Sequence, residues 1–211
     1  MRSPSLRLRF GAYARYNLTP LPPPKCVSRA RRWYDGGGIY RHVWLNAVTT
    51  PGPFLGPHGV YAPSQVTGAI SWTGGAPFAD ASLTPSVEVW NNATTASAFS
   101  VSLGIFSAAG GLIASASGSG SAAAGAPGAA SVTVWSPSAP LAMPAAALWH
   151  LVDAPLKPAL YTLVTVLSVG GTDVDTHNVT FGVRATNWNA SSGFWLNGIN
   201  IKIMGTANHQ D

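Results

Sequence analysis

The sequence predicts an all-β fold, an antiparallel β-sandwich between about residues 58 and 185. Three observations predict it: short runs in which apolar and small residues alternate, turn residues between these runs, and 23 glycines and 17 prolines among 211 residues. Alternation with a period of two places one set of side chains on the buried face of a strand. About seven such runs separated by turns are typical of a sandwich and do not fit long helices.

The clearest run is 99–105, where Phe99, Val101, Leu103 and Ile105 share one face and small residues occupy the other. Further strands are expected over residues 66–72, 86–90, 112–115, 131–135, 160–169 and 179–183. The stretch 160–169 becomes apolar on both faces, which favours a central place in its sheet. Glycine pairs predict the turns beside it and before residue 112.

Other segments are expected to lie outside the sandwich. The prolines of 51–57 predict a loop that separates an aromatic-rich strand at 39–45 from the sandwich. The Gly/Ala/Ser stretch 115–131 predicts a flexible loop. Residues 1–28, rich in proline and arginine, receive no assignment and are expected to be disordered. Asn197-Gly198 predicts a hairpin turn, followed by an alternating strand over 199–203.

Charge is concentrated at the N-terminus: nine of the twelve basic residues lie in the first 41 positions, and the net charge is +5. A basic arm can bind nucleic acid, but no aromatic-interleaved groove or nucleic-acid motif accompanies it, so no nucleic-acid partner is expected. A single cysteine, Cys26, excludes an internal disulfide and a zinc cluster. No apolar run approaches the length of a membrane span, and no membrane partner or cofactor is expected. Oligomeric state and compartment stay open.

Three separated segments resemble glycoside hydrolase family 2, of the β-galactosidase type. They are Arg32–Leu45, with an Arg-Trp-Tyr, glycine, Ile-Tyr-Arg pattern; Pro158–Leu163, followed by Asp175 and Phe181–Arg184; and Gly193–Gly198, leading to Gly205–Asp211. Their order matches the family's domain order. The resemblance implies the last strand of a sugar-binding jelly roll over 29–50 and an immunoglobulin-like β-sandwich over 56–185. It also implies a connector and the truncated first strand of a (β/α)₈ barrel over 186–211.

The resemblance implies a fragment of a retaining glycoside hydrolase that acts on O-glycosyl bonds, with a carbohydrate substrate for the full-length parent. The segment itself would be the non-catalytic sandwich that links the sugar-binding and catalytic domains. The alternative is a stand-alone, non-catalytic β-sandwich that binds carbohydrate or protein.

No residue of this chain is expected to be catalytic. Retaining glycosidases use two carboxylates, and the resemblance implies two glutamates on barrel strands beyond residue 211. The only glutamate of this sequence, Glu88, is expected on the solvent face of a strand and is interpreted as a surface carboxylate. Asp173 and Asp175 are interpreted as turn residues.

One substrate-binding residue is implied by the resemblance. His209 matches a sugar-contacting histidine at the end of the first barrel strand, where active sites of such barrels gather. Its alternative is a histidine in a frayed tail. Arg184 is expected to anchor the sandwich to the barrel through an ion pair or a carbonyl contact.

The N-terminal aromatic strand offers two weaker candidates. Asp35 and His42 are too few ligands for a metal site, so none is expected. A sugar-stacking platform and core aromatics are equally good interpretations of the four rings Trp33, Tyr34, Tyr40 and Trp44.

Overall fold

The computed structural model describes residues 9–10, 45–46, 48, 50–151 and 158–207. These residues form strands and turns and contain no helix. The chain divides into two compact units, one of residues 1–49 and 205–211 and one of residues 50–204. In the first unit, β1 (Arg9–Phe10) pairs antiparallel with β2 (Leu45–Asn46). In the part of the chain that the structure describes, no helix has the length and apolar character needed to cross a bilayer.

The second unit contains the sandwich. Its strands are β3 (Pro53–Tyr61), β4 (Ser64–Val66), β5 (Ser71–Thr73), β6 (Ala76–Leu83), β7 (Ser86–Asn91), β8 (Ser97–Ser107), β9 (Leu112–Ala122), β10 (Ser131–Trp135), β11 (Leu141–Ala147), β12 (Tyr161–Val169) and β13 (Thr172–Phe181). Every pairing between them is antiparallel. The predicted all-β, antiparallel fold is therefore confirmed, with more strands than the seven expected.

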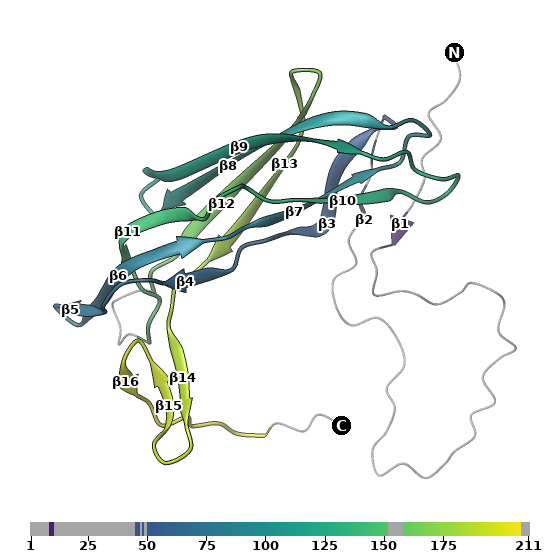
Figure 1. Cartoon of the computed structure of the whole chain (residues 1–211). Coiled ribbons are helices and arrows are strands. Elements are labelled where there is room, and N and C mark those ends of the chain that lie inside the picture. The colour runs from purple at the N-terminus through teal and green to yellow at the C-terminus, as the bar shows by residue number, and fades with distance from the viewer. Residues whose placement is uncertain (1–8, 11–44, 47, 49, 152–157, 208–211) are drawn as a thin grey trace, which may run out of the picture. The chain divides into compact units, whose positions relative to one another are not determined.

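One layer of the sandwich consists of three long strands, each broken once (Figure 1). The strands of one half of the layer have the order β10-β7-β3, and those of the other half have the order β11-β6-β4. Along the chain β10 continues as β11, β6 as β7 and β3 as β4, so each pair forms one long strand. Each break contains proline: Pro63, Pro85, and the pair Pro137 and Pro140. Proline has no backbone N–H to donate to a ladder, so it ends a strand in the middle of a sheet. The prolines therefore divide the layer at one level.

The other layer is the four-stranded sheet β13-β12-β8-β9. The alternating run of β8 faces the core as predicted, since Phe99, Val101, Leu103 and Ile105 are all buried. From β12, Leu163 and Leu167 lie on the same buried face, while Val87 and Val89 come from β7 in the opposite layer. The central place predicted for 160–169 is also confirmed, because β12 lies between β13 and β8.

The two layers are joined at their edges by different contacts. At one edge, the Leu55 backbone N–H of β3 donates a 2.9 Å hydrogen bond to the Asp175 carboxylate of β13. At the other, a Cβ on Gly118 of β9 would lie 2.7 Å from the Trp135 ring of β10. Only glycine lets the indole pack so closely. Asp175 is therefore a contact between layers, and its interpretation as a turn residue is wrong.

The Gly/Ala/Ser stretch was expected to be a loop, and this expectation is wrong for its first half. Residues 112–122 form β9, which pairs with β8 from Leu112 to Ala122. Small residues stand where neighbouring rings need space: a Cβ on Gly120 would meet the Phe99 ring at 2.5 Å. The small residues of β9 therefore make room for neighbouring rings and do not indicate a flexible loop.

The proline-rich segment 51–57 was also expected to be a loop, but Pro53–Tyr61 is β3. It is an edge strand, the place in a sheet that tolerates proline. Leu55 and Val60 are buried, and the register with β7 shifts between them. The strand expected over 66–72 is instead split into β4 and β5, which both pair with β6. The sequence reasoning missed β6 and β11.

The expectation for residues 1–28 lies outside the described residues, except at Arg9–Phe10, which pair with Leu45–Asn46. The interpretation of residues 29–50 as a jelly-roll remnant stays a prediction, as does the barrel strand. At the C-terminal side, the strand expected over 199–203 is realised only as Ile199–Asn200, and residues 201–207 lie outside strands.

Candidate functional site

A three-stranded antiparallel sheet follows the sandwich, formed by β14 (Thr186–Asn189), β15 (Gly193–Leu196) and β16 (Ile199–Asn200). The predicted turn between β15 and β16 is confirmed: Asn197 and Gly198 have φ of 49° and 80°. Both values lie in the left-handed region that Asn-Gly turns use. In the other turn, the Asn189 side-chain oxygen accepts hydrogen bonds from the N–H groups of Ser191 and Ser192.

Asn197 attaches this small sheet to the sandwich. Its side chain is fully buried, accepts a hydrogen bond from the Ala185 N–H at 2.9 Å and donates one to the Trp149 carbonyl at 2.9 Å. The Trp149 N–H in turn donates to the Val183 carbonyl at 2.7 Å. Because each polar atom of the buried amide has a partner, the attachment is specific and oriented.

Arg184 lies at the same attachment. Its guanidinium carbon is 5.2 Å from the centre of the Trp149 ring, a cation–π distance. An ion pair or a carbonyl contact was expected for Arg184. Among the described residues, its contact is instead with the Trp149 ring. Its place after the last sandwich strand agrees with the sequence prediction.

The small sheet has two different faces, because cross-strand partners share a face. One face is apolar: Trp188 pairs with Phe194, their ring centres 4.8 Å apart, and Leu196 pairs with Ile199. Trp188 is 69% exposed and Ile199 42% exposed. The other face carries Trp195 between Asn187 and Asn200, its register partners in β14 and β16.

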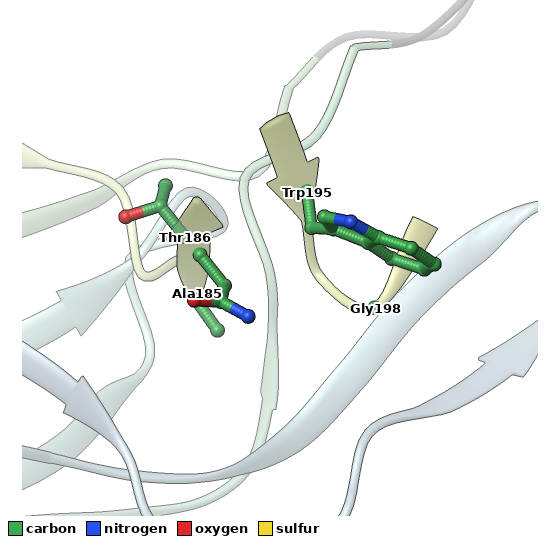
Figure 2. A pocket seen from close by; sticks show the side chains of 5 residues that line it. Ala185, Thr186, Trp195 and Gly198 are labelled. Atoms are coloured by element: carbon green, nitrogen blue, oxygen red, sulfur yellow. The ribbon is translucent and has the colours of Figure 1, made fainter. Parts of the chain in front are cut away.

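A shallow pocket of about 140 Å³ opens on this sheet, lined by Ala185, Thr186, Asn187, Trp195 and Gly198. Figure 2 shows the Trp195 indole near Gly198 on one side and the Ala185–Thr186 segment on the other. No lining residue carries a charge. The indole N–H of Trp195 donates a 2.9 Å hydrogen bond to the Ser192 hydroxyl, which fixes the orientation of the ring.

The described carboxylates all have structural partners. The indole N–H of Trp90 donates to Glu88 at 3.1 Å, and the Ser168 hydroxyl donates to Asp173 at 2.6 Å. The Ala145 N–H donates to Asp80 at 2.8 Å and so holds the backbone of a β-bulge. Glu88 is half-buried on the outer face of β7, less solvated than the sequence suggested. These carboxylates support strands, and none lines the pocket.

His150 is a titratable group in an unusual environment. Its ring packs edge-on against Trp72 with centres 4.9 Å apart, and its Nδ1 is buried without a hydrogen-bond partner. Desolvation lowers the pKa of His150 below its ordinary value of 6.5. Within the described residues, no group of three or more His, Cys, Asp or Glu side chains could hold a metal ion.

A sequence profile decides the family. The profile of glycosyl hydrolases family 2 matches residues 72–184, which are more than half of the chain. The chain belongs to this family. The matched interval runs from β5 to just beyond β13, the last sandwich strand, so the resemblance seen in the sequence is confirmed for the sandwich.

The relatives of this family 2 chain are longer proteins. It is 31% identical over 181 residues to a β-galactosidase of Bacteroides ovatus, a match that covers 85% of this chain and 19% of that enzyme. A solved β-glucuronidase of Bacteroides uniformis shares 26% identity, with a TM-score of 0.63 over 83% of this chain and 19% of that one. A family 2 member from Bacteroides cellulosilyticus has the same fold, with a TM-score of 0.61 over 79% of this chain and 20% of that chain. The chain thus spans about a fifth of the length of these relatives.

The sequence-predicted site of this family 2 chain is only partly described. His209, the implied substrate-binding residue, lies outside the described residues, as do Asp35, His42 and the four rings of residues 33–44. The roles given to them stay predictions. The pocket beside Trp195 was missed, because its lining comes from a polar connector and a hairpin whose pairing alone brings Asn187 beside Trp195.

Proposed function

We propose that this chain is the non-catalytic sandwich segment of a retaining glycoside hydrolase, and that it links a sugar-binding domain to a catalytic barrel. The observation that carries the proposal is the apolar face of the small sheet. Trp188, Phe194 and Ile199 share this face, and buried Asn197 holds the sheet to the sandwich in one orientation. An oriented, exposed apolar patch is typical of a surface that packs against another domain.

For the parent we propose hydrolysis of a terminal β-linked sugar, with a β-galactoside as the substrate. Support comes from the β-galactosidase of Bacteroides ovatus, which matches 85% of this chain. In that parent His209 would contact the sugar, and two glutamates of the barrel would supply the nucleophile and the proton donor. The segment described here would contribute rigidity and spacing.

The first test is the full transcript. We expect the reading frame to continue past Asp211 into a barrel with two glutamates about 5–5.5 Å apart, the separation of a retaining enzyme. A stop codon directly after Asp211 would contradict the proposal and favour the stand-alone sandwich.

The second test asks whether the apolar face packs against the rest of the enzyme. Trp188 and Tyr61 are a matched pair, because they are 69% and 67% exposed in this segment. In the full-length protein, Trp188→Ala should lower the thermal midpoint and kcat, whereas Tyr61→Ala should change neither. Equal effects of the two substitutions would rule out a docking role for the apolar face.

A further inference from the structure

The opposite face of the small sheet carries an arrangement that a docking role does not use. Trp195 of β15 lies between two amides, with Asn187 of β14 and Asn200 of β16 as its register partners. Neighbouring side chains of a strand point to opposite faces, so Trp195 faces away from the apolar surface of Trp188 and Phe194. The pocket beside Trp195 is therefore a separate feature of the molecule.

The polar groups of this face are held in place with one exception. The Asn200 amide donates to the carbonyls of Ser192 and Phe194, and the Trp195 indole N–H donates to the Ser192 hydroxyl. The Asn187 amide is exposed and makes no hydrogen bond to any described residue. A fixed ring therefore stands beside an amide whose two donors and two acceptor lone pairs remain available.

The size and charge of the pocket restrict the ligand. About 140 Å³ is well below the roughly 300–1,000 Å³ of pockets for drug-sized molecules, so the pocket has room for no more than one small ring. Gly198 adds no side chain, and a Cβ there would find no atom within 4 Å. The lining carries no charge, so it offers no ion-pair partner to a carboxylate, a phosphate or an ammonium group, and a neutral ligand suits it better.

We propose that this pocket binds a single neutral pyranose residue. One face of a pyranose ring presents C–H groups, which stack on the apolar surface of an indole. Its hydroxyls both donate and accept hydrogen bonds, and the Asn187 amide can do the same. The proposal goes beyond the role as a linking segment, since the side chains that carry it, Asn187 and Trp195, lie on the other face of the sheet.

The experiment uses the 211-residue chain and NMR spectra of its indole N–H groups. Methyl β-D-galactopyranoside is titrated to about 100 mM, because a single stacked ring gives a Kd of roughly millimolar order. Sorbitol, a polyol without a ring face, is the control. We expect the Trp195 signal, assigned with a Trp195→Phe variant, to shift saturably with the pyranoside and not with sorbitol. No saturable shift, or the same shift with sorbitol, overturns the proposal.

Two variants separate binding from folding. Asn187→Ala removes an exposed amide without a described hydrogen-bond partner, so the fold should stand while the Kd rises roughly 2- to 10-fold, the worth of one hydrogen bond. Trp188→Ala removes an equally aromatic side chain from the other face and should leave the Kd unchanged. A Kd that responds to Trp188→Ala and not to Asn187→Ala places the sugar on the apolar face and overturns the proposal. These outcomes are independent of the transcript, which tests the linking function.

Discussion

The side-chain amide of Asn197 donates a 2.9 Å hydrogen bond to the carbonyl of Trp149, which lies 48 residues earlier in the chain. The same amide accepts a hydrogen bond from the Ala185 N–H. A single buried side chain thus joins the hairpin turn, the connector and the end of the sandwich. This relationship leads to the first prediction.

Asn197→Ala should lower the free energy of unfolding by about 2–4 kcal/mol, because it leaves the Ala185 N–H and the Trp149 carbonyl without partners. The substitution also places alanine at a φ of 49°. Urea unfolding measures the loss. Asn189→Ala is the control, because its exposed side chain bonds only within its own turn and its loss should cost less. Equal losses of unfolding free energy in the two variants would mean that the buried hydrogen bonds of Asn197 contribute no more to stability than an exposed turn.

Thr165→Val should raise the free energy of unfolding by about 1 kcal/mol. Thr165 is fully buried on the core face of β12, and its hydroxyl has no hydrogen-bond partner. Valine keeps the shape and removes the desolvated group. Thr162→Val, on the opposite face of β12, is the matched control and should have a smaller effect. A destabilised Thr165→Val variant would indicate a partner for the hydroxyl, such as a bound water.

Gly118→Ala should lower the free energy of unfolding by about 1–3 kcal/mol, because the added Cβ would lie 2.7 Å from the Trp135 ring. Gly111→Ala is the matched control: its nearest neighbour, the Ser107 hydroxyl, is 3.4 Å from the added Cβ. Thermal unfolding and the near-ultraviolet circular dichroism of Trp135 report the change. If both variants unfold at the same temperature, β9 does not pack on Trp135 as described.

The stability of the sandwich should fall with acid in a way that depends on His150. Burial lowers the pKa of His150 below 6.5, so the unfolded chain binds the proton more readily than the folded one. The contribution of neutral His150 is present above pH 6.5 and is lost as the pH falls through the lowered pKa. His150→Phe keeps a ring beside Trp72 and should flatten this dependence. The free energy of unfolding of both proteins is measured at about pH 5 and about pH 8. The same change between the two pH values in the wild type and in His150→Phe would contradict the prediction.

The isolated chain should not hydrolyse aryl β-glycosides. Catalysis of this type needs a nucleophile and a proton donor, and the described carboxylates are engaged in strand contacts. The assay uses a panel of nitrophenyl β-glycosides beside a Glu88→Gln variant. Turnover that disappears in the variant would assign the chemistry to Glu88.

The sequence predicted those parts of the fold that depend on local periodicity. The faces of β8 and β12 follow from alternation, and the Asn197-Gly198 turn follows from the backbone preferences of two residues. It failed where a distant neighbour decides the structure. In the sequence, Gly118 and Gly120 are typical of a flexible linker. In the structure they pack against the rings of Trp135 and Phe99, which leave no space for a Cβ.

The same reason limits prediction of the candidate site. Asn187 and Trp195 are separated by a turn, and only the register of β14 and β15 makes them partners. Asp175 was interpreted from its own segment, but its hydrogen bond to Leu55 spans 120 residues. Pairwise contacts of this kind leave no periodic signal in one sequence. The anchoring role expected for Arg184 stays a prediction, and its contact with the Trp149 ring could not be foreseen.

The aligned prolines of the three long strands have a consequence for how this layer can change during evolution. A one-residue insertion normally slips a strand and exchanges its inner and outer faces along its whole length. Here an insertion in β10 would be absorbed at the segment between Pro137 and Pro140, and β11 would keep its alignment with β6. The two halves of the layer can therefore accumulate length variation separately, one half changing while the other preserves its inherited pairing.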